Sequence, residues 1–392
     1  MSPRKDVFLQ PHDPPSEPGT APQAAVPPTA AATQVKGGTL LLSGFWARGN
    51  AGDEAMLQAV IETMGEGFDY ALSVDEHGAH QGFWDWYPYA GRRIVNQSQT
   101  DAILRIPDAI GLLAGGGGLP LGFGAGQQIY ARARGLKTAI AGIDIWSMAA
   151  NASKSAAAEA GRYLGHFDRA YVRTESSIEN ARLGGFADVL KLGADWALNL
   201  NADLDPAIGD ERDRALVVLR EDDRSVLAPD YREQIRRLLA ALWGVGLVPV
   251  LLPYAPEDER LLEELGLGRL APVDRSWWNA RRLKQLSARS GLTLSIGRLH
   301  PMIFAAPTGR PVMTVGRPTI KAGRRADGKL RHMAADLGVD LHDTVADAVL
   351  AIEAGQIRPA DADRVAAAKA RLDAQADDLR RFFAKMPPAR PA

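Results

Sequence analysis

The sequence contains no cysteine among its 392 residues. This absence excludes disulfide bonds, thiolate metal ligands, iron–sulfur clusters and cysteine nucleophiles, so any catalysis must use other side chains. An excess of charge of one sign is also missing, because 46 Lys and Arg face 47 Asp and Glu, for a net charge of -1. A chain without a general basic field lacks the usual means of sequence-independent binding to nucleic acid, and we expect no nucleic-acid partner.

Long hydrophobic runs are missing as well. The apolar stretch at residues 238–253 comes nearest, but glycines and a proline interrupt it, and a membrane-spanning helix needs about 20 apolar residues. Residues 1–13 show no apolar segment typical of a secretory signal. We therefore expect a cytoplasmic protein.

Metal-ligand spacing is the last notable absence. The two D-x-D pairs, Asp203-Leu204-Asp205 and Asp361-Ala362-Asp363, fall in a polar connection and on an expected helix surface, with no cluster of His, Asp and Glu beside them. We predict no metal and no resident cofactor.

What the chain does contain is an alternation of short apolar runs with amphipathic stretches, typical of β-α units that feed a parallel sheet. A Pro- and Ala-rich segment, residues 1–38, comes first and is expected to be a disordered tail. The alternation predicts an N-terminal α/β domain over residues 39–200, a polar linker at 201–213 and a C-terminal α/β domain over 214–358. Residues 359–392 are expected to form a final helix and tail. This organisation is an α/β fold with two Rossmann-like domains facing a cleft, the usual ligand site of such sheets.

Ten strands are expected from this pattern, with helices filling the gaps between them. The strands are residues 39–43, 70–74, 110–114, 138–141, 169–172, 189–192, 215–220, 247–252, 293–296 and 311–315. The helices include residues 54–64, 155–164, 231–242, 281–289 and 361–383.

A glycine-rich segment with Asn50, Asp53 and Glu54 joins the first expected strand to the first helix. It resembles a nucleotide fingerprint only superficially, because carboxylates in the first helical turn would repel a pyrophosphate. Carboxylates there suit hydroxyl groups better. The alternative is that Asp53 caps the helix while the glycines serve the turn.

A run of glycines, Gly115 to Gly118, follows the apolar residues 110–113. Such a run marks a place where the backbone approaches something closely, either a ligand or another chain segment. The G-x-G-x-x-G spacing of a dinucleotide site is not present.

The sharpest motif is Arg298-Leu299-His300, which follows an expected strand and precedes Pro301, a good first residue of a helix. Arg298 and His300 would offer an anion clamp beside a titratable group at the cleft. The alternative is a histidine satisfied by local hydrogen bonds.

Two further basic features follow strand ends. Arg220 is a candidate anion ligand, or else the partner of nearby acids on the surface. The basic residues from Lys321 to Arg331, with Lys329 among them, would close over a phosphate or form a solvated face.

Taken in order, these motifs resemble the polysaccharide pyruvyl transferase family over about residues 39–340. Gly44 to Glu54 resembles its Gly-aromatic-aromatic … Gly-Asn-x-Gly-Asp-Glu segment, and Leu113 to Gly118 its apolar-Gly-Gly-Gly stretch. Val172 to Ser176 resembles its V-R-D-x-x-S segment, Arg220 its strand-ending arginine and Arg298 to His300 its R-L-H motif.

The resemblance implies a two-domain fold like that of the GT-B glycosyltransferases. It implies transfer of the enolpyruvyl group of phosphoenolpyruvate to a hydroxyl pair of a glycan, giving a pyruvate ketal and phosphate, in exopolysaccharide or cell-envelope polysaccharide biosynthesis. Phosphoenolpyruvate would be a co-substrate. A lipid-linked glycan acceptor would bring the chain to the inner face of the cytoplasmic membrane as a peripheral protein.

The resemblance also assigns residues by position. The donor phosphoenolpyruvate would be bound by Arg220, Arg298, His300 and Lys329, with Lys321 as the alternative lysine. His300 would be the catalytic acid, with Asp53 or Glu54 as the base. The acceptor side would be Asn50, Asp53, Gly116 and Gly117.

Two other functions remain open at this point. One is a nucleotide-sugar-dependent glycosyltransferase of the same GT-B architecture. The other is a catalytically silent glycan-binding protein.

Overall fold

The computed structural model describes residues 37–74, 89, 91–118, 126–145, 154–202, 208–220, 230–316, 320–321, 324–325 and 328–384. The chain divides into two units, residues Met1–Val35 and Lys36–Ala392, and all of the elements below belong to the second. The expected tail lies outside the described residues except for its last two positions, and so do the aspartates of the first D-x-D pair.

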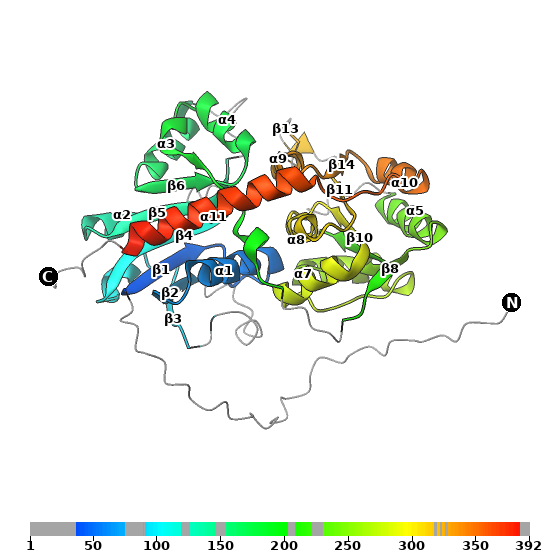
Figure 1. Cartoon of the computed structure of the whole chain (residues 1–392), viewed down its shortest axis with the longest axis horizontal. Helices are drawn as coiled ribbons and strands as arrows, with labels where there is room; N and C mark the ends of the chain where they lie inside the picture. Colours follow the sequence, from blue (N-terminus) through cyan, green and yellow to red (C-terminus); the bar gives the residue numbers. More distant parts are fainter. Residues whose placement is uncertain are drawn as a thin grey trace, which may run out of the picture. The chain divides into compact units, whose positions relative to one another are not determined.

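The first sheet has seven strands in the order β3-β2-β1-β4-β5-β6-β7, all paired in parallel (Figure 1). Its strands are β1 (Thr39–Gly44), β2 (Asp69–Val74), β3 (Arg93–Asn96), β4 (Ala109–Gly118), β5 (Lys137–Asp144), β6 (Arg169–Val172) and β7 (Lys191–Leu192). The connecting helices are α1 (Ala51–Met64), η2 (Ala102–Arg105), α2 (Gln127–Ala133), α3 (Lys154–Leu164), α4 (Glu175–Leu183), η3 (Ala187–Val189) and η4 (Trp196–Asn199).

The second sheet has five parallel strands in the order β14-β11-β10-β8-β9. Its strands are β8 (Glu211–Leu219), β9 (Val248–Leu251), β10 (Ser290–Ile296), β11 (Val312–Val315) and β14 (Asp340–His342). The helices around it are α5 (Tyr231–Gly244), α6 (Pro256–Glu264), η6 (Leu267–Arg269), α7 (Ala280–Arg289), α8 (His300–Ala305), η7 (Ala306–Thr308), α9 (Gly328–Leu337) and α10 (Val345–Glu353). A short antiparallel pair, β12 (Ile320–Lys321) and β13 (Arg324–Arg325), stands apart from the sheet.

The structure differs from the sequence prediction at several strands, four of which bear on the sheet edges and the linker. Edge strands β3 and β14 were not predicted, because each is short and carries charged or polar residues. β8 begins at Glu211, inside the expected linker, because its charged first residues extend the ladder with β10. The expected strand at 189–192 shrinks to β7, since a short 3-10 helix, η3, occupies the residues before it.

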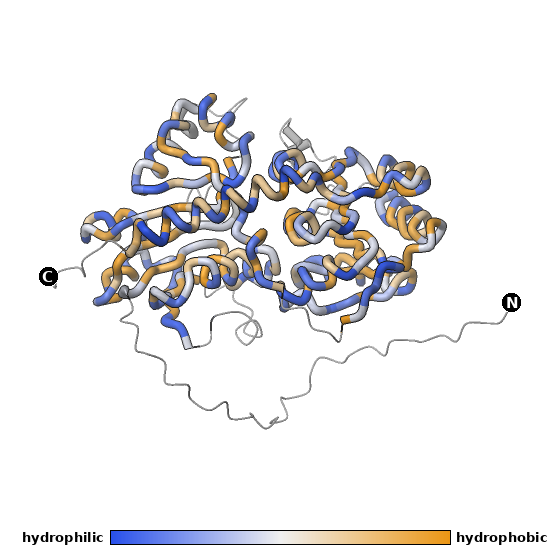
Figure 2. Tube along the Cα trace, viewed as in Figure 1, coloured by the Kyte–Doolittle hydropathy of each residue, from blue (hydrophilic) through white to orange (hydrophobic). Residues whose placement is uncertain are grey.

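The core is continuous between the two sheets. The central strands are apolar runs buried on both faces, as in β1, where Leu40, Leu41 and Leu42 are inaccessible to solvent. Figure 2 shows such hydrophobic stretches along the strands of both sheets. One buried cluster includes Leu42 of β1, Val218 of β8 and Phe304 of α8, so residues of both sheets share it. Burying each such side chain contributes about 1.5–3 kcal/mol, and the shared cluster therefore ties the two halves together.

The final helix, α11 (Ala362–Ala384), runs back past both sheets (Figure 1). The Tyr171 hydroxyl of β6 donates to Asp378 at 2.6 Å, and Lys137 of β5 donates to the carbonyl of Phe382 at 2.7 Å. Nearer the start of α11, Arg371 pairs with Asp336 of α9 at 2.5 Å. α11 thus contacts elements of both halves.

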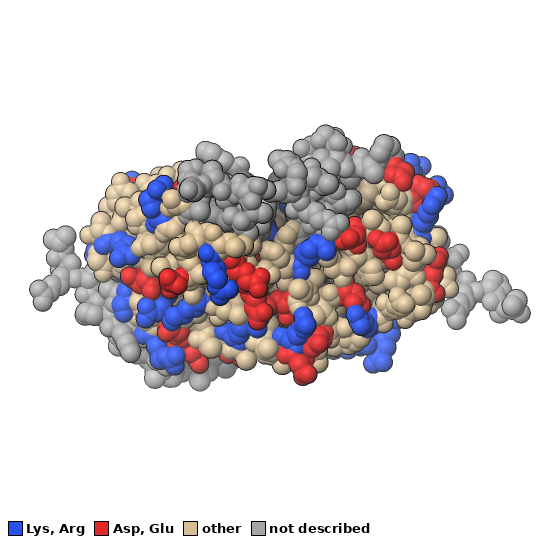
Figure 3. All heavy atoms as spheres, turned by 90° about the horizontal axis from the view of Figure 1, so that it is seen from above, with Lys and Arg blue, Asp and Glu red and all other residues tan. Residues whose placement is uncertain are grey.

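Charged side chains of both signs mix on the face seen in Figure 3. Arg105, among the residues that the structure describes, forms an exposed ion pair with Asp101 at 3.3 Å. Among the described residues, no helix combines the length and apolar character needed to cross a membrane.

Candidate active site

The R-L-H motif leads from β10 into α8. β10 ends at Ile296, and Gly297 then takes the left-handed conformation with φ 74°, which turns the chain. His300 is the first residue of α8 and Pro301 the second, one residue earlier than predicted. The His300 ring packs on the first turn of α1, where a Cβ on Gly52 would lie 1.8 Å from Nδ1. Only glycine at position 52 leaves room for this imidazole.

His300 is 8% exposed and faces a carboxylate. Its Nε2 lies 3.9 Å from Oδ2 of Asp195 and has no hydrogen-bond partner within the described part of the chain. Burial lowers the pKa of His300 to about 4; Asp195 opposes this effect, and the cations of Arg173, Arg298 and Lys329 add to it. The imidazole is therefore neutral near pH 7 in the protein alone.

Arg173 forms the charged centre of the site. Its side chain is 1% exposed, and its guanidinium donates to Asp144 from Nε at 2.8 Å and from Nη2 at 2.6 Å. Nη1 donates to Oδ2 of Asp195 at 2.7 Å, the same oxygen that faces His300. Two inaccessible carboxylates thus compensate one buried cation, which fixes Asp195 in place.

Sequence reasoning did not assign these three residues to the site. Arg173 was noted only as part of the V-R segment that follows a strand, and Asp144 and Asp195 were not singled out. The available signal was position, because Asp144 ends β5, Arg173 follows β6 and Asp195 follows β7. The carboxyl ends of parallel strands meet at one sheet edge, where ligand sites lie.

Asn50, and not Asp53, caps α1. The Asn50 Oδ1 accepts from the amide of Gly52 at 3.1 Å, and its Nδ2 donates to Oδ2 of Asp53 at 2.7 Å. The alternative reading of Asp53 as the cap is therefore wrong. Burial raises the pKa of Asp53 to about 6, against the attraction of Lys329, Arg173 and Arg298. Asp53 consequently shares the electrostatic environment of His300.

Glu54 has a different environment from its neighbour. It is inaccessible to solvent and accepts a hydrogen bond from the Tyr89 hydroxyl, which itself accepts from the amide of Ala47 at 2.8 Å. Burial raises the pKa of Glu54 to about 8. Ala47 has φ 59°, so Glu54 and Tyr89 hold the strained turn between β1 and α1.

Arg298 is held by a carboxylate that the sequence analysis did not single out. Asp258, in the first turn of α6, accepts from Nε of Arg298 at 2.9 Å and from Nη2 at 2.5 Å. Asp258 is inaccessible and also accepts from the amide of Tyr254 at 3.0 Å. The carbonyl of Tyr254 in turn accepts from the amide of Ala51 in α1 at 2.9 Å, which links the two halves beside the site.

Lys329 and Arg220 meet the same cluster from the second sheet. Lys329 is the second residue of α9, and burial lowers its pKa, with Arg173 and Arg220 acting in the same direction and Asp144 and Asp53 against them. Arg220 directly follows β8 and is exposed, with its amide donating to the carbonyl of Ile296 at 3.2 Å. For Lys321 the described structure gives only its place in β12.

The glycine run contacts other chain segments at two positions. Gly115 to Gly118 form the end of β4, where a Cβ on Gly115 would lie 2.3 Å from the carbonyl oxygen of Ala141. Gly116 has φ 82°, and a Cβ there would lie 2.9 Å from the ring of Trp46. Gly116 therefore supports the turn after β1, and Gly117 pairs with Ile143 within the sheet.

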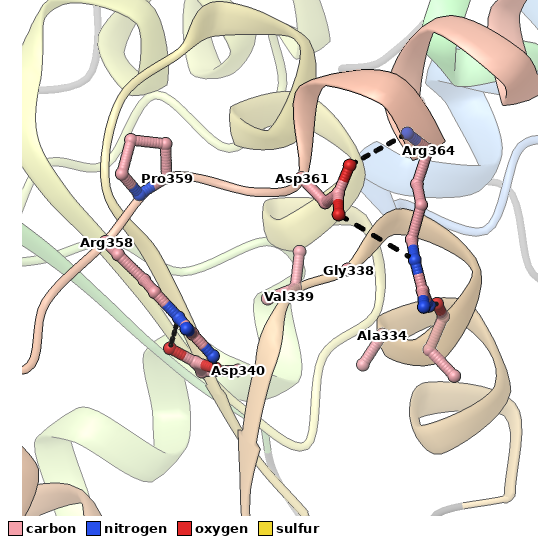
Figure 4. A pocket seen from close by; sticks show the side chains of 9 residues that line it. Ala334, Gly338, Val339, Asp340, Arg358, Pro359, Asp361 and Arg364 are labelled. Carbon is pink, nitrogen blue, oxygen red and sulfur yellow. Dashed lines mark hydrogen bonds and ion pairs between the residues drawn. The ribbon is translucent and has the colours of Figure 1, made fainter.

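A pocket of about 420 Å³ lies elsewhere, where α9 ends and α11 begins. Figure 4 shows that its arginines turn to neighbouring acids, Arg358 to Asp340 and Arg364 to Asp361. None of the predicted site residues lines this pocket.

Within the described ranges, no group of three or more His, Asp or Glu residues is placed to hold a metal ion.

Solved structures share the fold at low sequence identity. UDP-N-acetylglucosamine 2-epimerase from Rickettsia bellii matches with a TM-score of 0.58 and 12% identity, over 88% of this chain and 96% of that one. The Neisseria meningitidis UDP-GlcNAc 2-epimerase bound to UDP-GlcNAc gives 0.54 and 11%, over 89% and 100%. HepE from Anabaena, in complex with UDP and glucose, gives 0.51 and 12%, over 89% and 97%. The chain therefore has a GT-B-like arrangement of two parallel α/β sheets, as predicted.

Sequence comparison identifies the family. No curated protein matches the chain. Residues 50–318 match the family described as polysaccharide pyruvyl transferase, a range that spans α1, the Arg173 cluster and the R-L-H motif. Membership implies a transferase. The chain thus belongs to the polysaccharide pyruvyl transferase family.

Proposed function

We propose that this protein transfers the enolpyruvyl group of phosphoenolpyruvate to a pair of glycan hydroxyls, forming a pyruvate ketal and releasing phosphate, in exopolysaccharide or cell-envelope polysaccharide biosynthesis. Family membership supports the reaction class. The observation that carries the assignment is the setting of His300, buried against Gly52 and 3.9 Å from Asp195 with cations around it.

The donor side is formed by cations that meet from several strand ends. Arg220, Arg298 and Lys329 supply positive charge for the phosphate and carboxylate of phosphoenolpyruvate. Asp258 engages the Nε and Nη2 atoms of Arg298, so the Nη1 side of the guanidinium is the one offered to the donor. Asp258 therefore orients the guanidinium of Arg298 and compensates part of its positive charge.

His300 is the proposed acid. Protonation of the methylene carbon of phosphoenolpyruvate makes the neighbouring carbon electrophilic, and a hydroxyl can then attack it. Burial and the surrounding cations keep His300 neutral in the free protein. A bound phosphate dianion adds negative charge beside these cations and raises the pKa of the imidazole, so the acid forms when the donor binds.

The acceptor side is the first turn of α1, with Asn50 and Asp53, beside the end of β4 with Gly116 and Gly117. Asp53 is the better candidate for the base, because it lies among the site cations whereas Glu54 is bonded to Tyr89. The first hydroxyl adds to the electrophilic carbon, phosphate leaves with the carbon–oxygen bond electrons, and the second hydroxyl closes the ring. Of the two hydroxyl protons, one replaces the proton given by His300 and one leaves with phosphate.

Thermal unfolding of the full chain with increasing phosphoenolpyruvate tests the donor site. A ligand at 100 times its dissociation constant stabilises a protein by about 2.7 kcal/mol. We expect saturable stabilisation in the wild type and its loss in Arg220→Ala. The matched control is Arg358→Ala, which removes another exposed strand-side arginine but leaves the site intact. Equal stabilisation of all three proteins would contradict the donor assignment.

A nucleotide-sugar glycosyltransferase is the second candidate. It is favoured by the structural matches to proteins bound to UDP-GlcNAc or to UDP and glucose. The same titration with UDP-GlcNAc distinguishes the two, because a nucleotide-sugar enzyme would be stabilised by it and not by phosphoenolpyruvate. A silent glycan-binding protein would be stabilised by glycan alone and would release no phosphate.

A further inference from the structure

Lys284 is a buried cation outside the group of residues assigned above. It lies on α7, is 7% exposed, and its side chain reaches η4. Its Nζ donates to the carbonyl of Ala197 at 3.1 Å and to that of Leu198 at 2.9 Å. These carbonyls belong to η4, so a lysine of the second half holds a helix of the first.

The segment that Lys284 holds begins with Asp195. The Asp195 Oδ1 caps η4 by accepting from the amide of Ala197 at 2.9 Å, while its Oδ2 binds Arg173 and faces His300. Ala197 is therefore bonded at its amide to Asp195 and at its carbonyl to Lys284. Side chains occupy both ends of η4, and a shift of this short helix would move the carboxylate.

A second contact fixes the same segment from the same helix. Arg281 of α7 pairs with Glu62 of α1, and Glu62 accepts from the amide of Asn201 at 3.1 Å. Residues 197–201 are thus attached to α7 at two places. The placement of Asp195 depends on the seating of α7 against η4.

We propose that Lys284 is a positioning residue for the reaction: by binding the carbonyls of η4 it holds Asp195 against Arg173 and His300. The inference rests on the proposed function for its catalytic consequence, whereas the hold on η4 is a property of the structure. Lys284 does not touch the reacting atoms; it acts through Asp195.

The charges around Lys284 make this hold dependent on pH. The acidic neighbours of Lys284 are Glu62 of α1 and Asp195, and Lys369 of α11 is a basic neighbour. Arg281 lies on the same helix, and His300 lies on α8, which packs against α7. Burial lowers the pKa of Lys284 to about 7; Lys369 adds to this effect, while Glu62 and Asp195 oppose it. The ammonium consequently loses its proton near neutral pH, which weakens its bonds to the two carbonyls.

Three variants of the full chain test the proposal. Lys284→Met keeps the length of the side chain but removes the charge and the donors, and Lys284→Gln keeps a neutral donor. Lys369→Met is the matched control, because it removes an exposed cation of the same neighbourhood while leaving the bonds from Lys284 to the η4 carbonyls in place. Amide hydrogen exchange of peptides covering residues 194–200 is measured together with kcat and KM for phosphoenolpyruvate across pH 6–9.

We expect faster exchange of residues 194–200 in Lys284→Met, and a kcat lowered by at least about tenfold with KM changed by less than about twofold. The limb of the pH profile that reports His300 should move to lower pH, because Asp195 no longer supports the imidazolium. Lys284→Gln should fall between Lys284→Met and wild type, and it carries the test if Lys284→Met does not fold. Lys369→Met should match wild type at pH 6, where Lys284 is charged in both proteins, and should keep the hold on η4 to higher pH, because the cation of Lys369 no longer lowers the pKa of Lys284.

The outcomes distinguish a failure of the inference about Lys284 from a failure of the proposed function. Unchanged exchange and kcat in Lys284→Met would overturn the inference, and so would faster exchange with unchanged kcat and pH profile. If the wild type releases no phosphate with any acceptor, the proposed function fails, while the exchange measurement still decides whether Lys284 holds η4.

Discussion

Gly52 and His300 occupy complementary space: a Cβ on Gly52 would lie 1.8 Å from Nδ1 of the imidazole. The two residues lie in helices that follow strands of different sheets, because α1 follows β1 and α8 follows β10. The glycine of the proposed acceptor-side segment thus leaves the space that the proposed acid occupies. This contact connects two motifs that lie about 250 residues apart in the sequence.

Gly52→Ala should displace His300 and lower kcat by at least about a hundredfold. The free energy of unfolding should change by less than the activation free energy does. Alanine favours a helix over glycine by up to about 1 kcal/mol, which offsets part of the cost of the clash with His300. Phosphate release and urea unfolding are measured in parallel. Gly244→Ala, at a helix end with open space around it, is the control and should keep full activity. A fully active Gly52→Ala would remove the role given to this contact.

The pKa of His300 should rise when a phosphate dianion binds. Burial holds it at about 4 in the free protein, so the imidazole stays neutral down to mildly acid pH. Negative charge among Arg173, Arg298 and Lys329 should raise it toward neutrality. Nuclear magnetic resonance of labelled histidine, with and without phosphoenolpyruvate, measures the change, and His300→Gln assigns the signal. A pKa that does not move on binding would argue against His300 as the acid.

His300→Gln should lower phosphate release by about 10²–10⁴-fold, the usual contribution of a general acid. Its melting temperature should stay within a few degrees of wild type, because Nε2 of His300 lacks a hydrogen-bond partner within the described residues and little bonding is lost. Stabilisation by phosphoenolpyruvate should persist, since the arginines remain. An active His300→Gln variant would leave the acid to be sought elsewhere.

Arg173→Met should destabilise the fold by about 3–5 kcal/mol, because it leaves Asp144 and Asp195 buried without their cation. Exposed pairs contribute much less, so the control Arg358→Met should leave the free energy of unfolding close to that of wild type. Urea unfolding at constant pH measures both. Equal losses for the two variants would mean that the buried cluster is not what stabilises this sheet edge.

The sequence predicted the architecture better than the contacts between the residues of the site. Apolar runs located the central strands, and the R-L-H and Asn-x-Gly-Asp-Glu segments led to His300, Asp53 and Asn50. The sequence did not reveal the roles of Arg173, Asp258 and Lys284, because each bonds to a partner that is distant in the chain. A single charged residue forms no sequence pattern from which its partner could be predicted. The cap of α1 was misassigned for a similar reason, because both Asn50 and Asp53 have suitable side chains and only the backbone geometry selects one.

Glu54→Gln should change how stability depends on pH. Burial raises the pKa of Glu54 from 4.5 to about 8. The folded state therefore binds this proton more tightly than the unfolded state, and the resulting stabilisation is complete below pH 4.5 and is lost as pH rises through about 8. Glutamine keeps an acceptor for the Tyr89 hydroxyl and carries no charge at any pH.

Urea unfolding of Glu54→Gln, of wild type and of the exposed control Glu66→Gln should be compared from pH 5 to pH 9. The variant should match wild type near pH 5 and exceed it near pH 9, by an amount on the order of several kcal/mol. Glu66→Gln should follow wild type throughout. A difference between Glu54→Gln and wild type that is constant with pH would show that Glu54 keeps an ordinary pKa in the fold. The turn between β1 and α1 would then depend on an ionised carboxylate, and Glu54 would return as a candidate base beside Asp53.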